Sequence, residues 1–85
     1  MMQKVHVANV AAGGSYIVGG YNLLIYVVPA GQSAVSGIYL VEGGTITTIK
    51  AADSRLSVTW GTEGTTFTSN FPSNVELRIL SFQLQ

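Results

Sequence analysis

The chain has 85 residues, with four Lys and Arg balanced by four Asp and Glu, and it contains no Cys. Charged residues make up only 9% of it, where a soluble domain usually carries about 25%. Without a basic excess there is no electrostatic footprint for a nucleic acid or an anionic membrane surface, and without Cys there is no disulfide framework, thiolate nucleophile or Cys-ligated zinc site.

Alternation of apolar and polar residues, interrupted by Gly, Pro, Asn and Asp, predicts short strands and no helix. In chain order the predicted strands are Gln3–Val10, Ser15–Val18, Tyr21–Val28, Ala34–Glu42, Thr45–Lys50, Arg55–Trp60, Thr65–Thr68 and Asn74–Leu84. About eight strands at this spacing predict an all-β fold, either a small antiparallel β-sandwich or a jelly-roll-like barrel. With no internal repeat and no break in composition, residues 1–85 are expected to form a single β-sandwich domain.

Glycine and proline mark the predicted turns. The pairs Gly19-Gly20 and Gly43-Gly44 each separate two strands, and both predict hairpins because two-residue loops need a positive φ. Residues 61–64 predict a longer hairpin loop with the positive φ on either of its glycines. Pro29 and Pro72 are each expected to end a strand.

The strand Tyr21–Val28 is apolar on both faces, with Leu24, Tyr26 and Val28 on the face opposite to Leu23, Ile25 and Val27. A two-layer sandwich covers only one face of each sheet. The second apolar face therefore needs cover from a loop, an additional layer or another subunit.

The C-terminal strand shows the same property with a change of phase. Val75, Leu77 and Ile79 share one face, whereas Leu80, Phe82 and Leu84 share the other. The adjacent Ile79 and Leu80 indicate a bulge, a strand that crosses between sheets, or an end whose outer face is buried. The N-terminal strand, with Val5 and Val7, is expected to pair beside this strand, because chain ends often lie close together.

Six large apolar side chains left in water would forfeit on the order of 10 kcal/mol, which is comparable with the whole stability of a domain. A chain of 9.0 kDa also buries little surface by itself, so help from association is expected. We therefore expect a homo-oligomer. Its predicted interface residues are Leu24, Tyr26, Val28, Leu80, Phe82 and Leu84.

The residues that commonly carry chemistry are few and dispersed. His6 is the only histidine; it lies on the strand face opposite to its neighbouring valines, which predicts a surface or interface imidazole. In an oligomer, several copies of His6 could meet around an axis and bind a metal or respond to pH. Glu76 and Arg78 share a strand face and predict a solvated ion pair. Because no base accompanies a nucleophile and no carboxylate pair or nucleotide-binding glycine motif occurs, we expect no enzyme, catalytic residue, cofactor or metal site.

Aromatic residues leave a second function open. Trp60, Tyr16 and Tyr39 are of the type that stacks on sugar faces, and a neutral, hydroxyl-rich β surface is compatible with carbohydrate. The alternative function is therefore a carbohydrate-binding, lectin-like module. The phase of Trp60 matches Leu56 and Val58, however, which predicts a core position for its indole.

Membrane and export signals are not evident. Residues 1–6 lack the apolar h-region of a signal peptide, and the longest apolar run, Leu23–Pro29, falls far short of the roughly 20 residues of a transmembrane helix. We expect no signal peptide, no transmembrane segment and no membrane insertion.

The layout of the chain resembles small β-sandwich modules of bacteriophage virions, which occur in tail fibres, head fibres and capsid decoration proteins. The segments that carry the resemblance are Gly13-Gly14-Ser15-Tyr16, Leu23–Val28, Gly37-Ile38-Tyr39-Leu40-Val41, Gly43-Gly44-Thr45-Ile46 and Val75–Leu80. The resemblance implies a structural, often trimeric, role in the extracellular virion particle, with other capsid or tail proteins and a host-surface glycan as partners. It carries over no functional residue.

Overall fold

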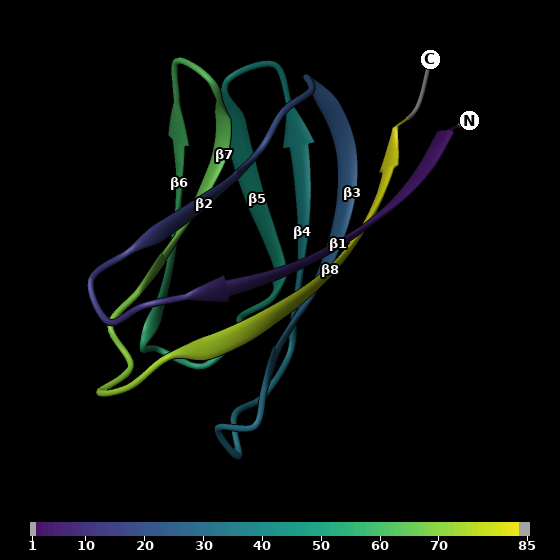
Figure 1. Ribbon diagram of the computed structural model, residues 1–85. Helices are drawn as coiled ribbons and strands as arrows, with labels where there is room; N and C mark the ends of the chain where they lie inside the picture. Colours follow the sequence, from purple (N-terminus) through teal and green to yellow (C-terminus); the bar gives the residue numbers. More distant parts are fainter. Residues whose placement is uncertain (1, 84–85) are drawn as a thin grey trace.

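The computed structural model describes residues 2–83 and shows an all-β protein, as predicted (Figure 1). Its strands are β1 (Met2–Val10), β2 (Ser15–Val18), β3 (Asn22–Ala30), β4 (Gly37–Glu42), β5 (Thr45–Lys50), β6 (Leu56–Gly61), β7 (Gly64–Ser69) and β8 (Val75–Gln83). They form a five-stranded sheet, in the order β1-β8-β3-β4-β5, and a three-stranded sheet, in the order β2-β7-β6. All pairs of neighbouring strands are antiparallel. The two sheets pack as a small β-sandwich, and within residues 2–83 no ladder joins them into a barrel.

The two terminal strands pair along their whole length, which confirms the expected neighbourhood of the chain ends. The β1–β8 ladder runs from Met2 opposite Gln83 to Val10 opposite Val75 without a shift. Figure 1 shows both ends of the chain at the same corner of the five-stranded sheet. β1 is an edge strand, and β8 lies between β1 and β3.

The two predicted hairpins after residue 40 are present, but the loop of the second is shorter than the four residues predicted. Gly43-Gly44 joins β4 to β5 with Glu42 opposite Thr45, and Gly43 has a φ of 61°. β6 and β7 are joined by a two-residue loop with Gly61 opposite Gly64. The positive φ of that hairpin falls on Gly64, at 137°, where an added Cβ would lie 2.4 Å from the Val18 carbonyl oxygen. Only glycine fits this close approach of two backbones.

The prediction of a hairpin at Gly19-Gly20 is wrong. β2 belongs to the three-stranded sheet and β3 to the five-stranded sheet, so the glycine pair carries the chain from one sheet to the other. Val18 pairs with Thr65, whereas Leu23 pairs with Val41 and Gln83. Strand partners far along the chain, rather than the local turn, decide this connection.

Pro29 lies within β3, which runs two residues further than predicted. The β3–β4 ladder ends at Val27 opposite Gly37, but the β3–β8 ladder continues to Ala30 opposite Glu76. Proline is tolerated here because the strand is paired on one side only, as at a sheet edge.

β8 is regular throughout, so the adjacent Ile79 and Leu80 mark neither a bulge nor a crossing between sheets. Its register to β1 and to β3 runs without a shift. Beyond Ile79, the buried Ser81 faces the core, whereas Leu80 and Phe82 face outward. The apolar end of β8 therefore belongs to the outer face of the five-stranded sheet.

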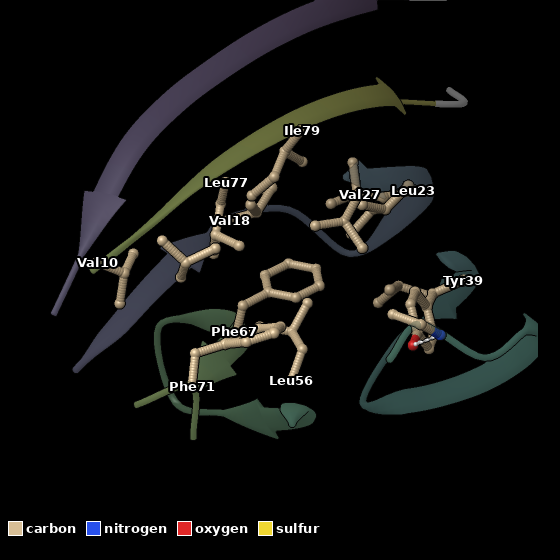
Figure 2. Close-up of a cluster of buried hydrophobic side chains, with 14 residues drawn as sticks. Val10, Val18, Leu23, Val27, Tyr39, Leu56, Phe67, Phe71, Leu77 and Ile79 are labelled. Atoms are coloured by element: carbon tan, nitrogen blue, oxygen red, sulfur yellow. Dashed lines mark hydrogen bonds between the residues drawn. The ribbon is translucent and has the colours of Figure 1, made fainter. Parts of the chain in front are cut away.

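The hydrophobic core fills the space between the sheets (Figure 2). Phe67 of β7 is fully buried and makes an edge-on contact with Tyr39 at a ring-centroid distance of 6.4 Å. The buried core residues are Val10, Val18, Leu23, Ile25, Val27, Tyr39, Val41, Ala52, Leu56, Phe67, Phe71, Val75, Leu77 and Ile79. Apart from Ala52 and Phe71, which lie in connecting segments, these residues come from the inner faces of the strands, so neither outer face contributes to the core.

Candidate functional site

The outer face of the five-stranded sheet carries a continuous group of aliphatic and aromatic side chains. The register places Val5 beside Leu80, Leu80 beside Tyr26, and Tyr26 beside Ile38, across four strands. The next row continues from Phe82 to Leu24 and then Leu40. We call this surface the apolar face; its members are Val5, Val7, Leu24, Tyr26, Val28, Ile38, Leu40, Leu80 and Phe82.

Five of the six predicted interface residues meet on the apolar face: Leu24, Tyr26, Val28, Leu80 and Phe82. Tyr26 is directly opposite Leu80, and Leu24 is directly opposite Phe82. Leu84, the sixth, lies outside the described residues. The prediction did not include Ile38 and Leu40 of β4, although their alternation with the buried Tyr39 and Val41 is the signal that would have found them.

The first part of β1, up to Val7, has an inverted polarity. Its two outward valines, Val5 and Val7, are 66% and 64% exposed, whereas Lys4 and His6 point to the inner side of the sheet. An ordinary half-buried strand turns its apolar residues toward the core. This orientation adds exposed apolar surface at the edge of the sheet and continues the apolar face beyond β8.

A shallow hollow of about 350 Å³ lies on the apolar face. It is bounded by Val5 on one side and by Tyr26 and Val28 on the other, with Leu80 at its centre and Arg78 at one end. A side chain from a second molecule would find aliphatic walls here.

The charges on the same side of the sheet are paired or peripheral. Arg78 Nε donates to Glu76 Oε2 at 2.6 Å, which confirms the predicted ion pair, and Arg78 separates Val7 from Val28. Lys50 lies opposite Ile38 on edge strand β5, where its Nζ donates to the Ser36 carbonyl oxygen. The apolar face thus carries no uncompensated charge at its centre.

The outer face of the three-stranded sheet has a different composition. Ser15 lies opposite Thr68 and Thr68 opposite Ser57, while the next row runs from Ile17 to Thr66 and Thr59. The Ser15 and Thr68 hydroxyls are hydrogen-bonded at 2.9 Å. We call this surface the hydroxyl face; its members are Ser15, Ser57, Thr59, Thr66 and Thr68. The chain therefore separates its low-charge surface into one hydroxylic side and one apolar side.

The three residues predicted to stack on a glycan do not form one site. Tyr39 is buried, and its hydroxyl accepts a hydrogen bond from the Ala52 N–H at 2.9 Å (Figure 2), so its ring is not accessible to a ligand and that prediction is wrong. Tyr16 is half-buried and its ring contacts His6. Trp60 packs against the core, as its phase predicted, but its indole also contacts Tyr21 at a centroid distance of 5.9 Å.

His6 connects the two sheets and does not lie on the apolar face. Its Nδ1 is hydrogen-bonded to the Tyr16 hydroxyl at 2.7 Å, and its Nε2 is buried without a hydrogen-bond partner. Burial lowers the pKa of His6 below its ordinary 6.5, and the positive charge of Lys4 lowers it further. The imidazole is therefore a contact between β1 and β2, in place of the predicted surface or interface group.

Asp53 and Arg55 form the best organised charged contact, in the segment between β5 and β6. The Asp53 carboxylate accepts from Arg55 Nε at 2.9 Å, from Nη2 at 3.0 Å and from the Arg55 backbone N–H at 3.0 Å. These hydrogen bonds lower the pKa of Asp53 to about 2. The Arg55 guanidinium also lies 4.5 Å from the ring centroid of Phe71. This arrangement closes one end of the core and leaves the carboxylate fully engaged by its own chain.

Residues 2–83 contain no group of three or more His, Asp or Glu side chains that could hold a metal ion. In the same part of the chain, no helix is long and apolar enough to cross a membrane. Comparison with protein-family models, curated proteins and solved structures found no match to the chain. The surfaces described above are therefore the basis for assigning a function.

Proposed function

We propose that the protein is a non-enzymatic structural module of a bacteriophage virion that assembles with copies of itself through the apolar face. The virion setting, as a capsid decoration, head-fibre or tail-fibre component, follows from the resemblance of the chain layout. The self-assembly follows from one observation: the sandwich exposes an apolar outer face on one sheet and a hydroxyl-rich outer face on the other.

The size of the apolar face suits a protein contact. β1, β8, β3 and β4 are about 20–30 Å long and about 4.8 Å apart, so they span roughly 500 Å² of flat sheet. The accessible surface of projecting side chains exceeds this flat area. Contact between two such faces therefore approaches the ~1,200 Å² at the lower end of specific interfaces.

Charge favours another copy of this chain as the partner. In a contact between copies of one chain, both partners bring the same charged residues. A surface whose charges all had one sign would therefore repel its partner. The apolar face avoids this, since Arg78 is paired with Glu76 and Lys50 is at the edge. A trimer, the order implied by the resemblance, would direct three apolar faces toward one axis and leave three hydroxyl faces outside.

Sedimentation velocity of the purified chain at micromolar concentration tests this proposal. We expect a species of defined order larger than one chain, which dissociates on dilution. A chain that stays monomeric at the highest soluble concentration would contradict the proposed assembly.

A further inference from the structure

Three glycine-containing connections meet at one end of the sandwich. The β4–β5 turn, the β6–β7 turn and the β2–β3 crossover lie at the same end in Figure 1. The β6–β7 turn touches the crossover, because Gly64 approaches the backbone of Val18 and Gly19. Gly44 of the β4–β5 turn faces the indole nitrogen of Trp60, where an added Cβ would be 3.1 Å away. Trp60 is thus held between turns from both sheets.

Tyr21 covers part of this indole and leaves most of its own ring in water. It is 67% exposed, and its ring centroid is 5.9 Å from that of Trp60, with the two planes at 46°. Beside them is a hollow of about 110 Å³, lined by Gly20, Tyr21, Trp60, Thr62, Glu63 and Gly64. The hollow combines aromatic surface, a hydroxyl and a carboxylate, with glycines that allow close approach to the backbone.

We infer that this hollow, which we call the turn-end site, binds one unit of a neutral saccharide. The C–H face of a sugar ring packs on an aromatic side chain, and its hydroxyls pair with carboxylate, hydroxyl and backbone groups. Glu63 is free to accept hydrogen bonds from sugar hydroxyls, since it forms no ion pair among the described residues. The same carboxylate repels acidic sugars and phosphates.

The ring geometry favours a sugar over a quaternary ammonium ion. Such a cation binds against the faces of aromatic rings, best within a cage. Here the two rings already contact each other, at a centroid distance of 5.9 Å and an angle of 46°, so they do not form the separated walls of a cage. A hollow of about 110 Å³ is smaller than the roughly 300–1,000 Å³ of pockets that enclose a drug-sized ligand, so a bound sugar would stay partly in solvent.

A partly covered sugar implies weak binding at each site, with a dissociation constant in the millimolar range. Copies of the chain held in one assembly would gain affinity for a polymeric glycan through multivalency. The turn-end site lies apart from the apolar face. Sugar binding and self-assembly can therefore be refuted independently of each other. The inference thus goes beyond the proposed structural role.

Trp60 is the only tryptophan in the chain, so intrinsic fluorescence reports directly on this site. We would titrate the protein with methyl glucoside, methyl galactoside, methyl mannoside and N-acetylglucosamine, and in separate arms with sialic acid and choline. The expected result is a saturable fluorescence change with at least one neutral sugar. The affinity read from this change should weaken at least tenfold in Tyr21→Ala and several-fold in Glu63→Ala, and stay the same in Val35→Ala.

Val35→Ala is the control because it removes another exposed large side chain, from the segment between β3 and β4, which belongs neither to the apolar face nor to the turn-end site. Unchanged thermal unfolding of Tyr21→Ala would show that the fold is intact, as expected for a largely exposed side chain. The inference is overturned if no neutral sugar gives saturation, if Tyr21→Ala binds as well as the wild type, or if only sialic acid or choline produces a response.

Discussion

Replacing Val5 by aspartate would place a charge on the apolar face with little effect on the isolated chain. Val5 is 66% exposed on edge strand β1, so the substitution removes few contacts within the monomer. Loss of a β-branched residue from a strand costs up to about 1 kcal/mol. The monomer should therefore remain folded.

The effect on assembly should be much larger. Full burial of a valine side chain is worth about 1.5–3 kcal/mol. If the contact buries the two thirds of Val5 that is exposed, it stabilises the assembly by about 1–2 kcal/mol. An unpaired carboxylate in the same place adds a desolvation cost of several kcal/mol. A combined loss of about 4 kcal/mol raises the dissociation constant on the order of a thousandfold.

Ile17→Asp is the matched control, since Ile17 also points outward from an edge strand, but on the hydroxyl side of the sandwich. Sedimentation velocity of both variants at equal concentration is the assay, with thermal unfolding as the check of the fold. We expect Val5→Asp to sediment as a monomer and Ile17→Asp to assemble like the wild type. Equal assembly of all three proteins, or equal loss in both variants, would refute the reasoning.

Three further predictions concern the stability of the sandwich. Gly64→Ala should lower the free energy of unfolding by about 3 kcal/mol or more, because its Cβ would meet the Val18 carbonyl oxygen. Gly43→Ala, also at positive φ but with open space around it, should lower it by only about 1–2 kcal/mol. Equal losses for the two variants in urea unfolding would contradict the packing described. His6 has a lowered pKa in the folded chain, so as the pH falls below 6.5 the unfolded chain binds a proton before the folded chain does. The free energy of unfolding should therefore decline as the pH falls below 6.5. A His6→Gln variant with the same decline would show that another group is responsible. Asp53 has a pKa of about 2 against an ordinary 3.8, so its contribution to stability is present above pH 3.8 and is lost as the pH falls through about 2. The free energies of unfolding of the wild type and Asp53→Asn should therefore converge as the pH falls from 3.8 to about 2. A constant difference between the two proteins would count against the role of these hydrogen bonds.

The strands could be predicted from the sequence because alternation and turn residues are local signals. All eight predicted strands have a counterpart, and Gly43-Gly44 forms the expected hairpin. Gly19-Gly20 has the same local appearance but joins different sheets. The choice depends on which strands pair across the whole chain, and no turn motif contains that information.

The outer face that carries Leu24, Tyr26 and Val28 could be predicted, because these residues share one phase of a strand whose other phase is also apolar. The wrong prediction that Tyr39 stacks on a glycan also comes from a strand that is apolar on both faces. β4 is apolar on both faces, so its sequence does not tell which phase is inside; the structure buries Tyr39 and turns Ile38 and Leu40 outward. Where no polar residue marks the solvent side, the phase is decided by packing against the second sheet.

His6 shows a related limit. Its opposition to Val5 and Val7 was predicted correctly, but in a half-buried strand the valines would be expected to face inward. The structure turns the imidazole inward to Tyr16, where it can form a hydrogen bond, and leaves the valines outside. This inversion is understandable if the outer face of β1 is covered by another molecule.

Thiol labelling would test most directly whether the apolar face is covered by other copies of the chain. The protein has no Cys, so Val5→Cys and Ile17→Cys each introduce a single reactive group, on the apolar side and on the hydroxyl side. We predict that Val5→Cys reacts slowly at the concentration where the chain assembles and quickly after dilution, while Ile17→Cys reacts quickly at both. Equal and concentration-independent labelling at the two positions would contradict the proposed assembly through the apolar face.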